Sequence, residues 1–161
     1  MRKRKLLSVL LLTAALVGAI ALGCVDTNDS ASTERTPGKK TNTMKIRIKL
    51  DNKTLTATLA DNATSADFVS LLPLTLTLKN YASTEKIGDL PKQLSTEGAP
   101  AGCDPDVGDI AYYAPWGNLA IFYKDSSNGY ARGLIKLGKI DEDVGALNTT
   151  DDLKTTIELI K

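Results

Sequence analysis

Hydrophobic and polar residues alternate along much of the chain beyond Met44. In KIRIKL (45–50) every second residue is apolar, which is the period-two pattern of a half-buried strand. Asp51-Asn52 supplies a turn, and TLTATL (54–59) then repeats the alternation. The two segments predict a β-hairpin.

The pattern changes period in NATSADFVSLLP (62–73). Three apolar residues of this segment share one face of a helix, Thr64 or Ser65 can cap its N-terminus, and Pro73 ends it. One short helix is therefore expected here.

The alternation resumes in LTLTLKN (74–80) and again in the last segment, LKTTIELI (153–160). Between them, residues 81–107 hold three prolines and several glycines, so this region is predicted to be rich in loops. The stretch 109–124 predicts a second hairpin. Many short strands with one or two short helices predict a mainly β fold, a closed β-barrel capped by those helices.

The N-terminus has the pattern of an export signal. A basic start, MRKRK, precedes the apolar run Leu6–Leu22, and Gly23-Cys24 follows before a polar stretch begins. The segment IALGC resembles a bacterial lipoprotein lipobox, whose cysteine is acylated and becomes the first residue of the mature protein. The length of the run alone leaves an uncleaved membrane anchor as the alternative.

These features predict three parts of the chain. Residues 1–23 are expected to be a lipoprotein signal peptide, 24–43 a flexible polar tether, and 44–161 the folded domain. The protein is then exported and anchored to a membrane by lipidated Cys24, since several acyl chains hold a protein stably where a single chain does not.

The charge balance excludes one class of partner. The chain carries 20 basic and 19 acidic residues, but four of the basic ones belong to the N-terminal MRKRK, which leaves 16 against 19 in the remainder. A mildly acidic domain lacks the basic face that nucleic-acid binding needs. The expected partners are the membrane and a small molecule, a peptide or an envelope protein.

The sequence favours neither a metal site nor a cofactor. It contains no histidine, which excludes Ser-His-Asp and Cys-His catalysis. Cys103 is expected to be a passive loop cysteine whose acidic surroundings raise its pKa. Asp104, Asp106 and Asp109 lack the spacing of a known calcium loop, so a solvated turn is favoured over a Ca²⁺ site.

Aromatic residues concentrate in the hairpin GDIAYYAPWGNLAIFYKD (108–125). Alternation places Tyr113 and Phe122 on the opposite faces of their strands from the remaining apolar residues. Core packing explains most of these side chains, but Trp116 lies at a turn, where deep burial is difficult. Together with the nearby arginine they form the candidate binding patch: Tyr112, Tyr113, Trp116, Phe122, Tyr123 and Arg132.

The segments from KIRIKL to LTLTLKNY, then EKIGDLP, the aromatic hairpin and LIKLGKI together resemble the bacterial cyclophilin-like domains. The resemblance covers nearly all of residues 44–161. It implies a cyclophilin-like β-barrel, in a family that has lipoprotein members and whose biochemical role is largely unassigned.

The residues of prolyl isomerases do not carry over. Isomerases of the cyclophilin group have a Phe-His-Arg stretch, and this chain has neither that stretch nor any histidine. No catalytic residue is therefore predicted. A non-enzymatic binding module in the cell envelope is favoured, and the alternative is a weak or specialised prolyl isomerase using Arg132.

Overall fold

The structure, a computed structural model, describes residues 43–127 and 129–161. The expected signal peptide (1–23), Cys24 and all but the last residue of the expected tether (24–43) lie outside the described residues. Within the described part of the chain, no helix is long and apolar enough to cross a membrane.

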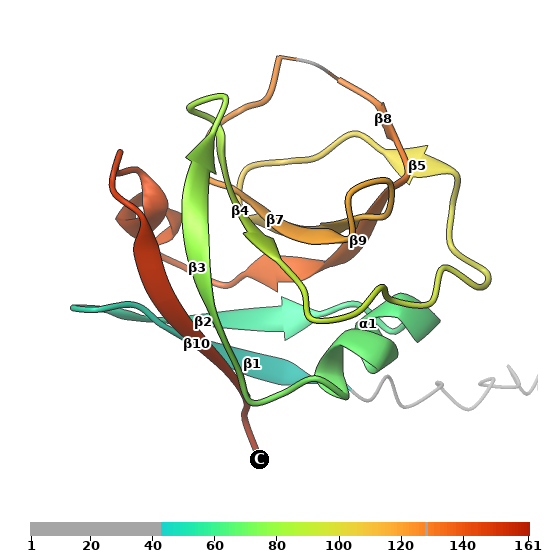
Figure 1. Cartoon of the computed structure of the whole chain (residues 1–161), viewed down its shortest axis with the longest axis horizontal. Coiled ribbons are helices and arrows are strands. Elements are labelled where there is room, and N and C mark those ends of the chain that lie inside the picture. The colour runs from blue at the N-terminus through green and yellow to red at the C-terminus, as the bar shows by residue number, and fades with distance from the viewer. Residues whose placement is uncertain (1–42, 128) are drawn as a thin grey trace, which may run out of the picture. The chain divides into compact units, whose positions relative to one another are not determined.

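Eight antiparallel strands close into a barrel in the order β1-β10-β3-β4-β7-β6-β9-β2 (Figure 1). Their bounds are β1 Lys45–Lys49, β2 Thr54–Leu59, β3 Leu74–Tyr81, β4 Glu85–Asp89, β6 Asp109–Tyr113, β7 Asn118–Phe122, β9 Leu134–Ile140 and β10 Leu153–Leu159. β5 (Gly102–Cys103) and β8 (Ala131–Arg132) form a separate two-stranded sheet. The predicted closed β-barrel is confirmed.

The barrel interior is filled by alternate residues of its strands. Ile46 and Ile48 of β1 have no exposed surface, and they face inward beside Ile157 of β10. The charged residues between them point out to solvent, as the period-two pattern predicted. The predicted hairpin is β1 paired with β2, with Ile48 opposite Leu55.

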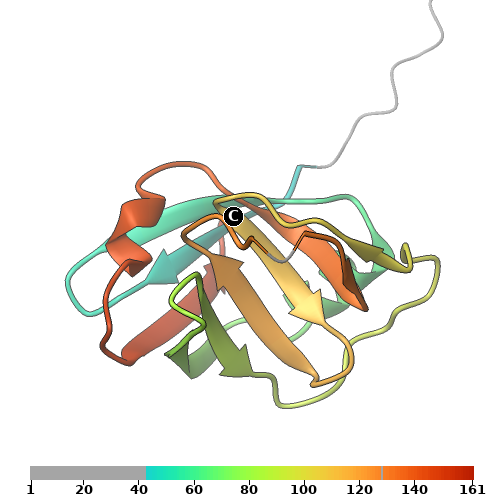
Figure 2. The ribbon, with the colours of Figure 1, turned by 90° about the horizontal axis from the view of Figure 1, so that it is seen from above.

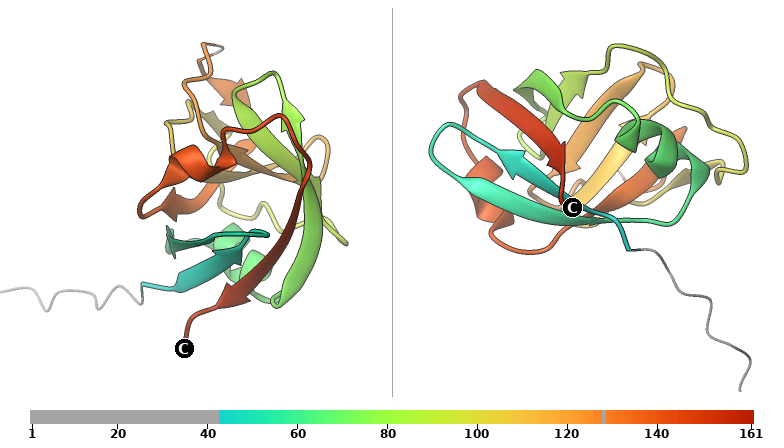
Figure 3. Two further views of the ribbon diagram at one scale, coloured as in Figure 1. Left: turned by 90° about the vertical axis from the view of Figure 1, so that its left-hand side faces the viewer. Right: turned by 90° about the horizontal axis from the view of Figure 1, so that it is seen from below.

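Two short helices lie on opposite sides of the barrel (Figure 3). The α-helix α1 (Ala63–Val69) buries Phe68, and the 3₁₀ helix η1 (Val144–Leu147) buries Leu147. The predicted capping residue of α1 was wrong: Asn62 caps the helix, and its side chain accepts a hydrogen bond of 2.8 Å from the Ser65 N–H. The Ser65 hydroxyl instead donates to the Leu137 carbonyl of β9.

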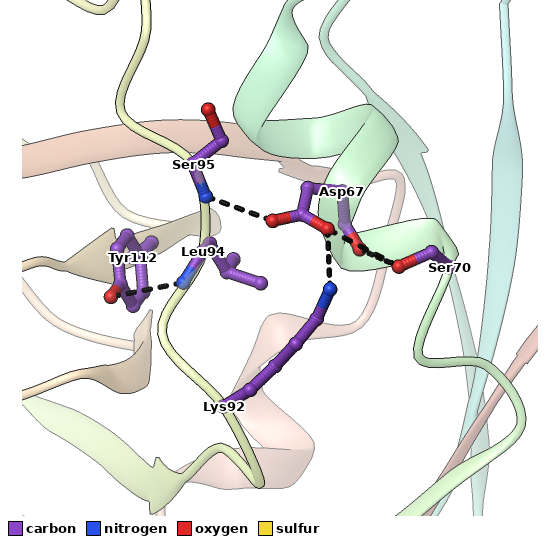
Figure 4. A network of polar contacts seen from close by, with 6 residues as sticks. All are labelled: Asp67, Ser70, Lys92, Leu94, Ser95 and Tyr112. Atoms are coloured by element: carbon purple, nitrogen blue, oxygen red, sulfur yellow. Dashed lines mark hydrogen bonds and ion pairs between the residues drawn. The ribbon is translucent and has the colours of Figure 1, made fainter.

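Asp67 of α1 fastens the helix to the segment that follows β4 (Figure 4). Its carboxylate accepts hydrogen bonds from Lys92 Nζ at 2.7 Å and from the Ser95 N–H at 2.8 Å. These two donors hold the pKa of Asp67 below its usual range. Close by, the Tyr112 hydroxyl accepts a hydrogen bond from the Leu94 N–H.

The strand β4 lies in the region that was predicted to be loops. Its inward positions are Lys86 and Gly88, so it lacks the alternating apolar pattern. Lys86 is fully buried, and its Nζ donates to the carbonyls of Thr149 and Asp151, each at 2.7 Å. Burial lowers the pKa of Lys86. This lysine therefore links the barrel interior to the segment that precedes β10.

Candidate functional site

One wall of the barrel is buried on both faces. The strands β6 and β7, side by side in Figure 2, place Tyr112 and Leu119 inside the barrel. Their outward residues form a second apolar cluster with β9, made of Ala111, Ala120, Phe122 and Leu134. Ala131 of β8 and Cys103 of β5 pack against this cluster, so the small sheet covers part of the wall.

A pocket of about 190 Å³ opens in this outer layer. The outward residues of β4, β6 and β7 form one side of it. The segments around β5 and β8 contribute to the other side, together with the end of β3, the β6–β7 turn and the start of β9. Its lining consists of Tyr81, Glu85, Ile87, Pro105, Tyr113, Trp116, Asn118, Ala120, Phe122, Ser126, Gly129, Ala131 and Leu134. The wall is mostly apolar and aromatic, which is typical of pockets that receive small organic groups.

Trp116 folds back over the barrel from the β6–β7 turn. The N–H groups of Trp116 and Gly117 both donate to the Tyr113 carbonyl, and Gly117 adopts a left-handed conformation with φ of 70°. The indole meets Tyr113 edge to face, with ring centroids 5.4 Å apart, and meets Tyr81 of β3 in the same way at 5.6 Å. The three rings form an aromatic rim, which leaves Trp116 58% exposed.

Glu85 is the acidic residue of the pocket lining. It lies opposite Tyr81 on β3 and opposite Phe122 on β7. Burial alone raises the pKa of Glu85 to about 7, because no charged or hydrogen-bonding group in the described residues compensates the lost hydration of the carboxylate. A carboxyl group that changes charge near neutral pH in a cavity is characteristic of functional sites.

Asn118 lies four residues before Phe122 on the same strand. It pairs with Tyr113 of β6 and with Asp89 of β4, and only 3% of its surface is exposed. Its Oδ1 atom is buried and accepts no hydrogen bond from the described residues. A buried acceptor without a donor destabilises a protein by about 1–3 kcal/mol. A ligand that donates a hydrogen bond to Asn118 Oδ1 would remove this penalty, which favours its binding.

The structure divides the six residues of the candidate patch between the two faces of the wall. Tyr113, Trp116 and Phe122 line the pocket. Tyr112 and Tyr123 point into the barrel, as the predicted alternation requires, and the Tyr123 hydroxyl donates to Asn80 Oδ1. The exposed Arg132 of β8 is not part of the pocket lining.

Of the lining residues, sequence reasoning identified only Tyr113, Trp116 and Phe122, and it missed Tyr81, Glu85 and Asn118 among the others. Tyr81 and Glu85 flank the β3–β4 turn inside the region predicted to be loops. They reach the pocket only because β4 pairs with β7, which is distant in sequence. The one available signal was the aromatic Tyr81 at the end of an alternating strand.

The other acidic groups lead to no site. Burial, and next Asp109, raises the pKa of the Cys103 thiol, as its acidic surroundings predicted. Asp109 is 2% exposed and pairs with Lys136 Nζ at 2.7 Å, while Asp106 is exposed. Among residues 43–127 and 129–161, no three His, Cys, Asp or Glu side chains are grouped to hold a metal ion.

The pocket combines acceptors with aromatic rings. Glu85 and Asn118 supply oxygen acceptors, and the rim and Phe122 present ring faces, which attract cations. When Glu85 is protonated, its neutral carboxyl group can also donate a hydrogen bond. This arrangement is suited to holding a ligand that has an apolar body and at least one N–H group.

Comparison with known proteins agrees with the fold. The profile of the Cyclophilin-like family matches residues 48–158. The solution structure of the hypothetical protein AF2241 from Archaeoglobus fulgidus superposes with a TM-score of 0.58 at 20% identity, covering 75% of this chain and 98% of that one. No curated protein matches the chain. The family match spans more than half of the sequence, and the chain therefore belongs to the cyclophilin-like family.

Proposed function

We propose that this protein is a membrane-tethered binding module of the cell envelope, whose pocket on the outer face of the barrel receives a small molecule or one residue of a peptide. The pocket itself carries the proposal. An engineered apolar cavity of about 150 Å³ accepts benzene, so a volume of about 190 Å³ accommodates a somewhat larger organic group.

The chemistry of the lining favours binding without catalysis. The chain has no histidine, and the described residues that line the pocket include no arginine or lysine. Glu85 is therefore without a second charged group beside it to share a proton transfer or to stabilise a developing charge. A weak prolyl isomerase remains the alternative, with Arg132 as the donor.

The membrane tether rests on the sequence. The basic start, the apolar run Leu6–Leu22 and Cys24 support lipidation of that cysteine. Partitioning of the full chain into the detergent phase, lost in Cys24→Ser, is the expected result. Retention of the unmodified chain in the aqueous phase would show that no lipid is attached.

A fluorescence screen tests the pocket. Trp116 is the only tryptophan of the chain and lies on the pocket rim, so its emission reports on occupancy. Capped single-residue amides and small ring compounds are titrated into the full chain and into Ala120→Met, which fills the pocket. The matched control is Ala101→Met, at an exposed position outside the lining.

We expect at least one compound to change Trp116 emission in the unmodified chain and in the control, and not in Ala120→Met. If no compound does so, the pocket is not a binding site. A protease-coupled isomerisation assay on proline tetrapeptides addresses catalysis: turnover that Arg132→Ala abolishes contradicts the binding-only proposal.

A further inference from the structure

We propose that the pocket selects an elongated organic cation, with an ammonium or guanidinium group at Glu85, an apolar stem along the pocket floor and a second N–H donor at Asn118. This inference rests on the proposed function and adds the chemistry of the ligand. It follows from three features of the lining: the carboxyl group, the aromatic walls and the unpaired acceptor.

The Glu85 end of the pocket is built for positive charge. Its carboxyl group has Tyr81 on one side and Phe122 on the other. None of the described residues forms an ion pair with this carboxyl group. Carboxylate oxygens accept hydrogen bonds from a cation, and aromatic faces within about 6 Å of a cation stabilise it further. An anion at this position would meet repulsion from Glu85 and from the ring faces.

The charged and titratable neighbours of Glu85 do not supply a counter-charge to its carboxylate. On β3, Tyr81 lies opposite Glu85, while the exposed Lys79 lies opposite Ile87 instead. On β7 the facing residue is Phe122, and Tyr113 lines the pocket from β6. None of them contributes to the raised pKa of Glu85, which comes from burial alone. A bound cation supplies the missing counter-charge and favours the ionised carboxylate.

The Asn118 end needs a donor. Phe122 and Asn118 are four residues apart on β7, which corresponds to about 13 Å of strand. Between them the outward residue is Ala120, whose small side chain leaves room for an apolar stem. Asn118 Oδ1 lacks a donor, and the terminal torsion of an asparagine side chain rotates readily to meet one.

Two kinds of molecule carry this chemistry. A free diamine has an ammonium group at each end of an alkyl stem. A lysine or arginine residue of a peptide has a cationic head, a stem of three or four carbons, and backbone N–H groups at the other end. Both place a cation and an N–H donor at the two ends of an apolar chain.

The test compares capped lysine, Nα-acetyl-lysine N-methylamide, with the matched norleucine compound, which has the same number of stem carbons and lacks the ammonium group. Cadaverine is the free diamine. Each is titrated into the full chain with Trp116 emission as the readout at pH 8 and at pH 6. The variants are Glu85→Gln and, as control, Glu97→Gln, which changes an exposed glutamate outside the lining.

We expect capped lysine to bind at least tenfold more tightly than capped norleucine at pH 8. Its affinity falls about tenfold at pH 6, because a group with a pKa of about 7 is ionised about nine-tenths of the time at pH 8 and about one-tenth at pH 6. Glu85→Gln removes the preference and the pH dependence, and Glu97→Gln keeps both. If cadaverine binds more tightly than capped lysine, the ligand is a free diamine. If capped lysine binds more tightly, the ligand is a basic residue of a peptide.

Equal binding of the lysine and norleucine compounds overturns this inference and leaves the pocket as a binding site. The comparison of capped lysine with capped norleucine needs no variant. It therefore tests cation selection even if Glu85→Gln fails to fold. If none of these probes binds, selection of a cation is wrong, and the screen of ring compounds decides separately whether the pocket binds anything.

Discussion

Replacing Glu85 by glutamine should stabilise the protein at alkaline pH and have no effect in acid. Burial raises the pKa of Glu85 from 4.5 to about 7. Between these values the native carboxyl keeps its proton while the unfolded chain has released it. The stability of the unmodified protein therefore falls as the pH rises through this window, whereas the neutral glutamine escapes that loss.

The size of the effect follows from the shift. One pKa unit corresponds to about 1.4 kcal/mol, so the full shift sets an upper limit of about 3 kcal/mol. Solvent reaches part of the pocket and screens the charge, which reduces the expected gain to about 2 kcal/mol at pH 8. For a domain of this size that gain raises the melting temperature by roughly 8 °C.

The measurement is thermal unfolding of the full chain, followed by Trp116 fluorescence, at pH values from 4.5 to 8.5. The control is Glu97→Gln, since Glu97 lies on the surface and outside the pocket lining. The difference between Glu85→Gln and the unmodified chain should be near zero at pH 4.5 and grow to its full value above pH 7. A difference that does not vary with pH would refute the burial argument.

Three further changes probe other parts of the structure. Asp67→Asn should destabilise the protein by about 1 kcal/mol at pH 7, since it weakens the contact with Lys92. Because the pKa of Asp67 is held below its ordinary value of 3.8, urea unfolding should show this loss constant down to about pH 4 and shrinking as the pH falls further. Gly138→Ala should lower the free energy of unfolding by about 2 kcal/mol, because the new Cβ collides with the backbone of β2, while Gly145→Ala, with open space around it, serves as the near-neutral control. Trp116→Ala should change the melting temperature, measured by circular dichroism, by only about 2 °C, since the side chain is 58% exposed, and yet abolish ligand binding measured by calorimetry.

The sequence predicted the strands whose inward positions are mostly apolar. In β1, β2 and β7 these positions hold Ile, Leu or Ala, and the alternation is visible without a structure. In β4 the inward positions hold Lys86 and Gly88, so the same geometry gives no apolar signal. The buried lysine is tolerated because two backbone carbonyls accept hydrogen bonds from its ammonium group, a contact that no local pattern reveals.

The pocket was less predictable than the fold. Alternation correctly separated Tyr113 and Phe122 from Tyr112 and Tyr123, but it does not show which strands become neighbours around the barrel. Glu85 enters the site because β4 pairs with β7 across more than thirty residues of sequence. Glu85 is a candidate site residue because this pairing partly buries it. The sequence EKIGD alone gives no indication of that burial.

The closure of the barrel also decides how the protein can be attached to a surface. β1 and β10 are neighbours, and the Ile160 N–H donates to the Lys45 carbonyl, so both ends of the domain emerge from the same wall. Counted around the eight strands, β7 is diametrically opposite β1. A sensor chip or a fluorescent fusion joined at either end of the domain is therefore attached at the wall that lies farthest around the barrel from β7, the strand that carries Asn118, Ala120 and Phe122 of the pocket lining.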